Sequence, residues 1–251
     1  MTLTDNPRGN YLFLPGISPY SCGVVAAPGY EVVHVTLSRL LPYRRGFEVI
    51  SGYLDRLKRP RHALCAVELR SPAPFTFEGF AQFNRGYREI LEDWGLLTDG
   101  VNPVARTNVA PEVGPPAEPA LHAFSCTVPS AEEGPTFVVA GAGEVREGRL
   151  ETSAIVREGE TSAEALTEKA AYVMERMSGR LGGLGVSWAG ATAVGVYTAH
   201  DLFPFLRSHI LSPASHAARH GIRWYLARPP VVGIEFEMDV RGVREERVLQ
   251  A

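Results

Sequence analysis

The chain has 251 residues, of which 45 % are hydrophobic and 21 % charged, and its net charge is −3 at pH 7. This apolar content supports a folded core and excludes a disordered chain, and a pI near 6.2 gives no electrostatic reason to expect a nucleic-acid partner. The polar first ten residues lack the features of a signal peptide, and no apolar run approaches a membrane span. We therefore expect a cytoplasmic protein without membrane contact.

The first half of the chain predicts strands on either side of two helices. Apolar and β-branched residues separated by Pro-Gly and Gly-Tyr turns indicate the strands. Apolar residues at helical spacing, such as Phe47, Ile50 and Leu54, indicate the helices. The expected elements, in chain order, are strands 11–18, 21–27 and 31–40, helix 44–58, strand 62–71, helix 76–94, and strands 104–111 and 120–128.

The second half repeats this order after a polar segment at 129–135 that is typical of a linker. Strands 137–145 and 150–158 are expected to form a hairpin around 146–148. The final predicted strand, 231–240, alternates apolar and acidic residues, which predicts one solvent-exposed face. The remaining elements are helix 161–185, strand 191–199, a Pro-interrupted helical region at 202–220, and strands 222–230 and 231–240.

The matching element order predicts an α+β chain of two tandem β-β-α-β-α-β-β units, residues 1–130 and 131–251. The two halves share little residue identity, so the repeat rests on the order of elements alone. If each unit builds a sheet with two helices on one face, the other face needs cover. We expect copies of the unit to supply that cover, which implies oligomerisation.

Both halves resemble the RidA/YjgF (Rid) family of imine and enamine deaminases. In the first half the resemblance is carried by FEGFAQFNRGYREILEDWG and NPVARTNV, and in the second by the stretch from ETSAEALTEKAAYVMERM to IRWYLARPPVVGIEFEMDV. Asn84 and Tyr87 match the Asn and Tyr of the family's helix. Pro103, Ala105, Arg106 and Thr107 match its Pro-Ala-Arg-(Thr/Ser) segment, with Val104 as an extra residue.

The resemblance implies a chorismate-mutase-like fold in which three units pack their sheets into a barrel, with active clefts between neighbouring units. It implies no cofactor. A single-chain tandem resembles the two-domain relatives known as 2-aminomuconate-type deaminases, and we expect a homotrimer or another homo-oligomer. No metal site is predicted, because the three cysteines are scattered and the pair His216 and His220 has no acidic third ligand nearby.

The resemblance assigns substrate binding to Arg106, with Asn84 and Thr107 beside it. A guanidinium offers a planar fork that binds a carboxylate through two hydrogen bonds. The alternative interpretation of Arg106 is a structural arginine at the start of a strand. The alternative for Asn84 is an amide on a helix surface. In the second half the corresponding residue is Arg223, with Arg228 as the alternative.

Glu235 is the expected catalytic residue, because it matches the first Glu of the family's Ile-Glu-Ile-Glu strand, which helps to position water. Imine hydrolysis needs such water and a group that moves protons. The corresponding residue of the first half is His122, which can also transfer protons near neutral pH. Both residues have plainer interpretations, as an outward-facing Glu and a packed His. The first half carries the clear Arg motif and the second half the clear Glu motif. We therefore expect a composite site that joins Arg106 to Glu235.

The expected function is hydrolysis of an enamine or imine that carries a carboxylate, with release of ammonia. Two alternatives stay open at this stage. One is chorismate-directed chemistry on the same scaffold, and the other is a non-catalytic small-molecule-binding protein, because a fold does not fix a function.

Overall fold

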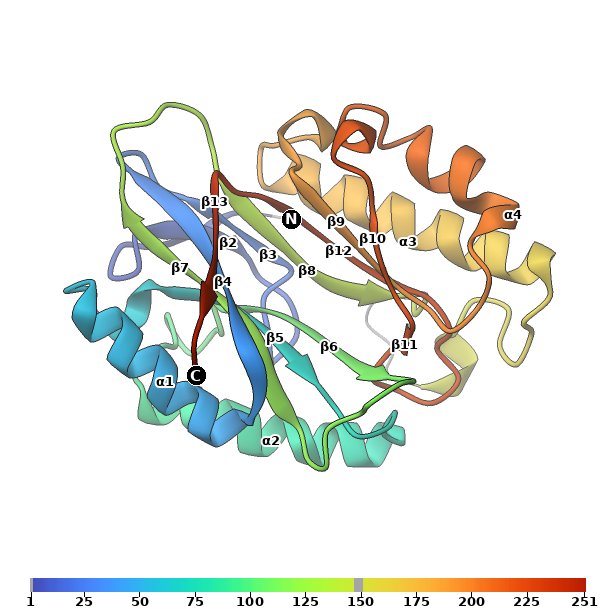
Figure 1. The fold of residues 1–251 in the computed structure, drawn as a ribbon, viewed down its shortest axis with the longest axis horizontal. Coiled ribbons are helices and arrows are strands. Elements are labelled where there is room, and N and C mark those ends of the chain that lie inside the picture. Colours follow the sequence, from blue (N-terminus) through green and yellow to red (C-terminus); the bar gives the residue numbers. More distant parts are fainter. Residues whose placement is uncertain (1, 147–150) are drawn as a thin grey trace.

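The computed structural model describes residues 2–146 and 151–251. Two β-sheets lie face to face between helices (Figure 1). The seven-stranded sheet has the order β1 (Thr4–Asn6), β2 (Tyr11–Leu14), β3 (Gly23–Ala26), β8 (Phe137–Gly143), β12 (Glu237–Gly242), β9 (Ala193–Tyr197) and β10 (Arg223–Tyr225). The six-stranded sheet has the order β11 (Ala227–Arg228), β6 (Ala105–Pro111), β5 (Leu64–Arg70), β7 (Ala120–Pro129), β4 (Tyr30–Pro42) and β13 (Glu245–Leu249).

Helices cover the outer faces of the two sheets (Figure 1). α1 (Tyr43–Arg56) and α2 (Phe77–Asp93) pack on the six-stranded sheet, where their apolar faces form one core with β4, β5 and β7. α3 (Ala163–Gly183) packs on the other sheet together with the broken helical region that was expected at 202–220. That region consists of α4 (Phe203–Phe205), a π-helix (Leu206–Leu211) and a 3₁₀-helix (Ala217–His220).

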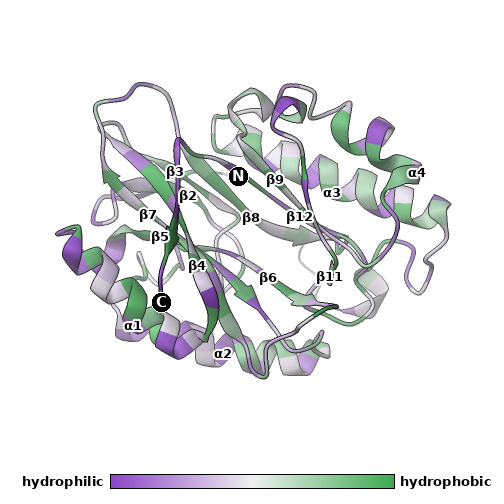
Figure 2. Ribbon diagram, in the orientation of Figure 1, coloured by the Kyte–Doolittle hydropathy of each residue, from purple (hydrophilic) through white to green (hydrophobic). Residues whose placement is uncertain are grey.

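Green and purple alternate along α1 and α3 in Figure 2, as expected of helices with one buried face. Short 3₁₀-helices at Arg61–Ala63, Thr152–Ala154 and Trp188–Gly190 complete the secondary structure of the described residues. None of the described helices has the length and apolar character that a bilayer-spanning segment needs.

The two halves exchange strands, whereas the sequence predicts one sheet for each half. The N-terminal strands β1–β3 join the second half's sheet through the pairing of β3 with β8. In return, β13 runs parallel to β4, and β11 pairs with β6, in the first half's sheet. The expected boundary near residue 130 stays a prediction.

Two further expectations from the sequence are wrong. Over residues 151–158 the predicted strand is replaced by the 3₁₀-helix Thr152–Ala154 and a single bridge between Val145 and Ile155, while position 150 and positions 147 and 148 of the expected turn lie outside the described residues. The last long strand begins only at Glu237, and none of its residues is wet, because its charged face is buried between the sheets.

A network of buried charges joins the inner faces of the sheets. Arg241 of β12 lies 3.4 Å from Glu68 of β5, which also faces Arg70 and His34. Burial opposes the ionisation of Glu68, but His34 in its charged form, then Arg241 and Arg70, outweigh it and hold the pKa of Glu68 below its usual value. Burial lowers the pKa of His34 to about 4, so the two arginines supply the positive charge at neutral pH. The inner face of each sheet is therefore covered by the other sheet of the same chain.

We expect Glu68→Gln to destabilise the protein by about 3–5 kcal/mol at about pH 7, because it removes the carboxylate partner of the buried Arg70 and leaves Arg241 with Glu246 alone. The pKa of Glu68 is lower in the folded chain than its ordinary value of 4.5, so its stabilisation is present above that pH and lost as the pH falls. Urea unfolding at a series of pH values measures the difference from wild type, which should shrink in acid. The exposed Glu48→Gln change is the control, and equal stabilities at neutral pH would contradict the prediction.

Candidate active site

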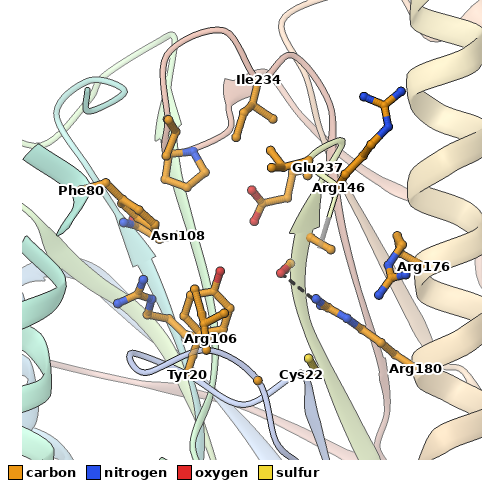
Figure 3. Close-up of a pocket in the computed structure, with 18 of the residues that line it drawn as sticks. Tyr20, Cys22, Phe80, Arg106, Asn108, Arg146, Arg176, Arg180, Ile234 and Glu237 are labelled. Carbon is orange, nitrogen blue, oxygen red and sulfur yellow. Dashed lines mark hydrogen bonds between the residues drawn. The ribbon is translucent and has the colours of Figure 1, made fainter. Parts of the chain in front are cut away.

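A cavity of about 600 Å³ opens where the ends of the two sheets meet, and both halves of the chain line it. The first half supplies the loop from Pro15 to Cys22, the start of α2, and β6; the second supplies the end of β8, one face of α3 and the loop before β12. Its size suits a small organic ligand. Figure 3 shows arginines on opposing walls, with the Glu237 carboxyl pointing into the space between them.

Arg106 lies on one wall, on the face of β6 that looks toward α2. Its guanidinium is within 6 Å of four aromatic rings, which belong to Tyr20, Phe80, Phe83 and Tyr87. Nη2 donates a 2.7 Å hydrogen bond to Oδ1 of Asn84, while the buried Nη1 has no partner among the described residues. Burial lowers the pKa of Arg106, opposed by Tyr87 and Tyr20, yet a guanidinium stays charged. The aromatic rings and Asn84 thus fix a cation with one free donor.

The opposite wall carries Arg180 and Arg176 from α3 and Arg146 from the segment after β8 (Figure 3). Arg180 is buried, and its Nη1 donates to the backbone oxygens of Ala140 (3.0 Å) and Gly141 (3.3 Å). Those bonds orient the group without neutralising it, and its Nε is buried without a partner among the described residues. An anion in the cavity would therefore meet positive charge on two sides.

Glu237 is the one carboxyl group among the described residues that line the cavity. Its side chain lies against Gly141, where an added Cβ would come within 2.2 Å of Oε1, so the glycine makes room for the carboxyl. Burial, then the nearby Asp239, raises the pKa of Glu237 well above its usual range, although Arg180 and Arg106 oppose the shift. No hydrogen bond ties this carboxyl to another described residue. A carboxyl group with a raised pKa and no hydrogen-bond partner among the described residues, facing a cavity, can serve as a proton donor.

A buried ion pair holds the loop that leads to Glu237. Glu144 and Lys169 have fully buried side chains and lie 3.1 Å apart. The Glu144 carboxylate also accepts hydrogen bonds from the backbone N–H groups of Glu235 (2.7 Å) and Phe236 (3.0 Å). Because these amides immediately precede Glu237, the ion pair fixes the point at which β12 begins.

The structure brings Arg106 and Asn84 together but places Thr107 elsewhere. Asn84 does not line the cavity and acts on it through Arg106. Thr107 points to the other face of β6, as strand alternation requires, and its hydroxyl donates a 2.8 Å hydrogen bond to Asp239.

Glu235 and His122 also lie outside the cavity lining. Glu235 precedes β12 and pairs with His200 (2.8 Å) and Arg228 (3.1 Å). His122 sits among the charges between the sheets, where burial, then Arg70, lowers its pKa to about 4.

The two arginines predicted as second-half counterparts of Arg106 lie at the surface. Arg223 pairs with Glu246 at 2.6 Å, and Arg228 pairs with Glu112 as well as Glu235. Neither lines the cavity.

Sequence reasoning missed Glu237, Arg180 and Asn108. Asn108 lies two residues beyond Arg106 on the same face of β6; its Oδ1 accepts from Ser71, and its buried Nδ2 has no partner within the described residues. A signal was present for Arg180, which falls at helical spacing among the buried residues Met177 and Leu181 of α3. A charge at such a position calls for a partner or a function.

Fold and cavity together define an α+β protein whose two sheets enclose a cavity with arginines on opposing walls and one buried acid between them. The chain belongs to the 2-aminomuconate deaminase CnbZ family, whose model matches residues 3–247. It is 41 % identical over 249 residues to the 2-amino-5-chloromuconate deaminase of Comamonas testosteroni, a similarity that covers 96 % of each chain.

Similarity to solved structures is weaker. A chorismatase aligns with 97 % of this chain and 80 % of its own at 11 % identity and a TM-score of 0.47. A proposed endoribonuclease from Thermotoga maritima aligns with 54 % of this chain and 92 % of its own at 20 % identity and a TM-score of 0.33.

We expect Glu237→Gln to raise the melting temperature at about pH 7. The pKa of Glu237 is raised in the folded chain, so stability falls as the pH rises through the ordinary value of 4.5 toward the folded pKa. A neutral amide removes that penalty.

Thermal unfolding and the infrared band of a protonated carboxyl test this prediction together. The wild-type band should persist well above pH 4.5 and be weaker in Glu237→Gln, because the buried Asp239 and Glu144, whose pKa values burial also raises, remain. The control, Glu48→Gln, should change neither quantity. A band that disappears near the ordinary pKa would show that Glu237 titrates normally.

Proposed function

We propose that the protein hydrolyses the C–N bond of 2-aminomuconate or a close analogue and releases ammonia. The observation that carries the proposal is the pair of arginine-bearing walls around one buried acid. Among the described lining residues, Arg106 on one wall and Arg180 on the other each have a buried nitrogen without a partner, against the single carboxyl of Glu237. A dicarboxylate is the ligand whose charge suits this excess. The named deaminase relative and the family match support the same reaction class.

Binding places one carboxylate on each wall. Arg106 offers its unpartnered Nη1 to one, and Arg180 offers its unpartnered Nε to the other. The side chains of Phe80, Val231 and Ile234 form an apolar surface between the walls, against which a planar carbon skeleton can lie. Both ends of the ligand are then fixed before any bond changes.

Proton transfer by Glu237 accounts for the chemistry that follows. Its carboxyl gives a proton to a carbon of the enamine, which becomes an iminium ion, and is left as a carboxylate. That carboxylate takes a proton from a water that attacks the C=N carbon. The resulting carbinolamine loses ammonia when a proton moves to nitrogen, which leaves a ketone. Enamine and water are thereby converted into ketone and ammonia, with no other reactant.

We expect Arg106→Ala and Arg180→Ala each to raise KM for 2-aminomuconate by about 10–100-fold, because each removes charge-assisted hydrogen bonds worth about 1.5–3 kcal/mol. Ammonia release from the freshly prepared substrate gives KM and kcat, and circular dichroism checks folding. The exposed Arg45→Ala is the matched control. Unchanged KM values in both cavity variants, or no ammonia release by the wild type, would refute the proposal.

The family's place within the wider Rid group, and a homotrimeric assembly, belong to the same proposal. The motif around Arg106 and Asn84 supports the first, since the two residues contact each other as parts of one site. For the second, we expect a mass about three times 27.3 kDa by light scattering coupled to size exclusion. A monomer mass would remove the trimer and leave the cavity intact, because a single chain lines it.

A further inference from the structure

The free polar groups of the cavity are donors of hydrogen bonds. The buried atoms without partners among its described lining residues include Nη1 of Arg106, Nε of Arg180 and Nδ2 of Asn108. Asn108 is fixed in this orientation because Ser71 donates to its Oδ1 at 2.9 Å. Donors of this kind stabilise an oxygen that gains negative charge, whether it belongs to a carboxylate, an enol or a carbonyl.

Glu237 supplies the proton for a carbon atom. Its carboxyl rests on Gly141 and projects into the cavity (Figure 3), so a ligand held between the arginine walls passes in front of it. The described lining also includes the hydroxyl group of Tyr20. Burial is the main cause that raises the pKa of this hydroxyl, which makes it a poorer acid than an ordinary tyrosine. A carbon-directed proton transfer in this cavity falls to Glu237.

An enol is the oxygen counterpart of an enamine. In both, a heteroatom lone pair pushes electron density onto the same carbons of the conjugated chain, and protonation there gives C=N or C=O. Nothing in the described lining requires nitrogen at that position, and the unpartnered donors suit oxygen.

We propose that the cavity also catalyses the enol–keto tautomerisation of 2-hydroxydienoates that carry a second carboxylate. The Glu237 carboxyl adds its proton to a chain carbon, the C=C bond shifts, and the enol O–H bond breaks as C=O forms. The hydroxyl proton passes to water or back to the Glu237 carboxylate, so the reaction is an isomerisation without any co-reactant. The inference rests on the same ligand placement as the proposed function, but it does not require the breaking of a C–N bond.

The test uses 2-hydroxymuconate, the oxygen analogue of 2-aminomuconate. Loss of the dienol absorbance in aqueous buffer reports ketonisation, and the rate without protein is subtracted. We expect wild-type protein to accelerate it by about 100-fold or more, the usual range for a positioned acid. Glu237→Gln should return the rate to that of buffer, whereas Glu48→Gln should behave as the wild type.

A second variant and a second readout separate catalysis from folding. In Gly141→Ala the new methyl group displaces the carboxyl of Glu237 without removing it, so the ketonisation rate should fall while circular dichroism stays unchanged. In D₂O the enzyme should place deuterium on one face of the product carbon, and the reaction in buffer on both, which NMR with a chiral shift reagent distinguishes.

The outcomes for the two activities are distinguishable. Ammonia release from 2-aminomuconate with ketonisation no faster than in buffer, or with unselective deuteration, would overturn the tautomerase inference and leave the proposed function standing. Ketonisation that depends on Glu237, without ammonia release, would overturn the proposed function and support proton transfer as the activity of the cavity.

Discussion

Glu237, Asp239 and Arg241 occupy every second position of β12 and share its buried face. The surrounding structure must pair, hydrogen-bond or protonate these three ionisable side chains. Burying a charge is costly unless it is paired, hydrogen-bonded or neutralised by a proton. Arg241 is paired with Glu68 and Glu246, and Asp239 accepts hydrogen bonds from Thr107 and Tyr197. Glu237 alone has neither kind of partner among the described residues, and burial, then the nearby Asp239, raises its pKa well above the usual range.

The neighbouring strands make room for these carboxyl groups. A Cβ at Gly141 of β8 would meet Glu237, and one at Gly195 of β9 would come within 2.3 Å of Oδ1 of Asp239. Glycine weakens a strand, so its use on both sides of β12 indicates that close seating of the two acids outweighs the cost. At one end of this strand face, Arg241 links the two sheets through Glu68. At the other end, Glu237 faces the cavity.

The sequence indicates residues near the cavity that belong to a local motif and misses those whose place there depends on strand register. Arg106 and Asn84 belong to recognisable segments, and the structure joins them. Glu235 and Glu237 are two residues apart, so an alternating strand would point both the same way. The strand instead begins at Glu237, because Glu144 binds the two preceding amides. Glu144 is distant in sequence from this strand, and no local pattern reveals the contact.

The side-chain contacts between the two sheets could not be predicted from the sequence either. The acidic alternation of the last strand suggested solvent, yet the opposite sheet covers it and supplies Thr107 and Glu68 as partners. Likewise, the sequence correctly indicated strands within residues 11–27, but not which sheet they would extend. Such choices depend on long-range contacts, which local propensity does not encode.

The exchange of strands between the halves has a consequence for the integrity of the chain. The linker near 131–135 is exposed and therefore offers a protease a place to cut the chain. After such a cut, the N-terminal fragment would still hold β1–β3 of the other fragment's sheet, and the C-terminal fragment would still hold β11 and β13 of its partner's. The nicked protein would remain a non-covalent pair with a single shared cavity, and neither fragment could leave without stripping strands from the other.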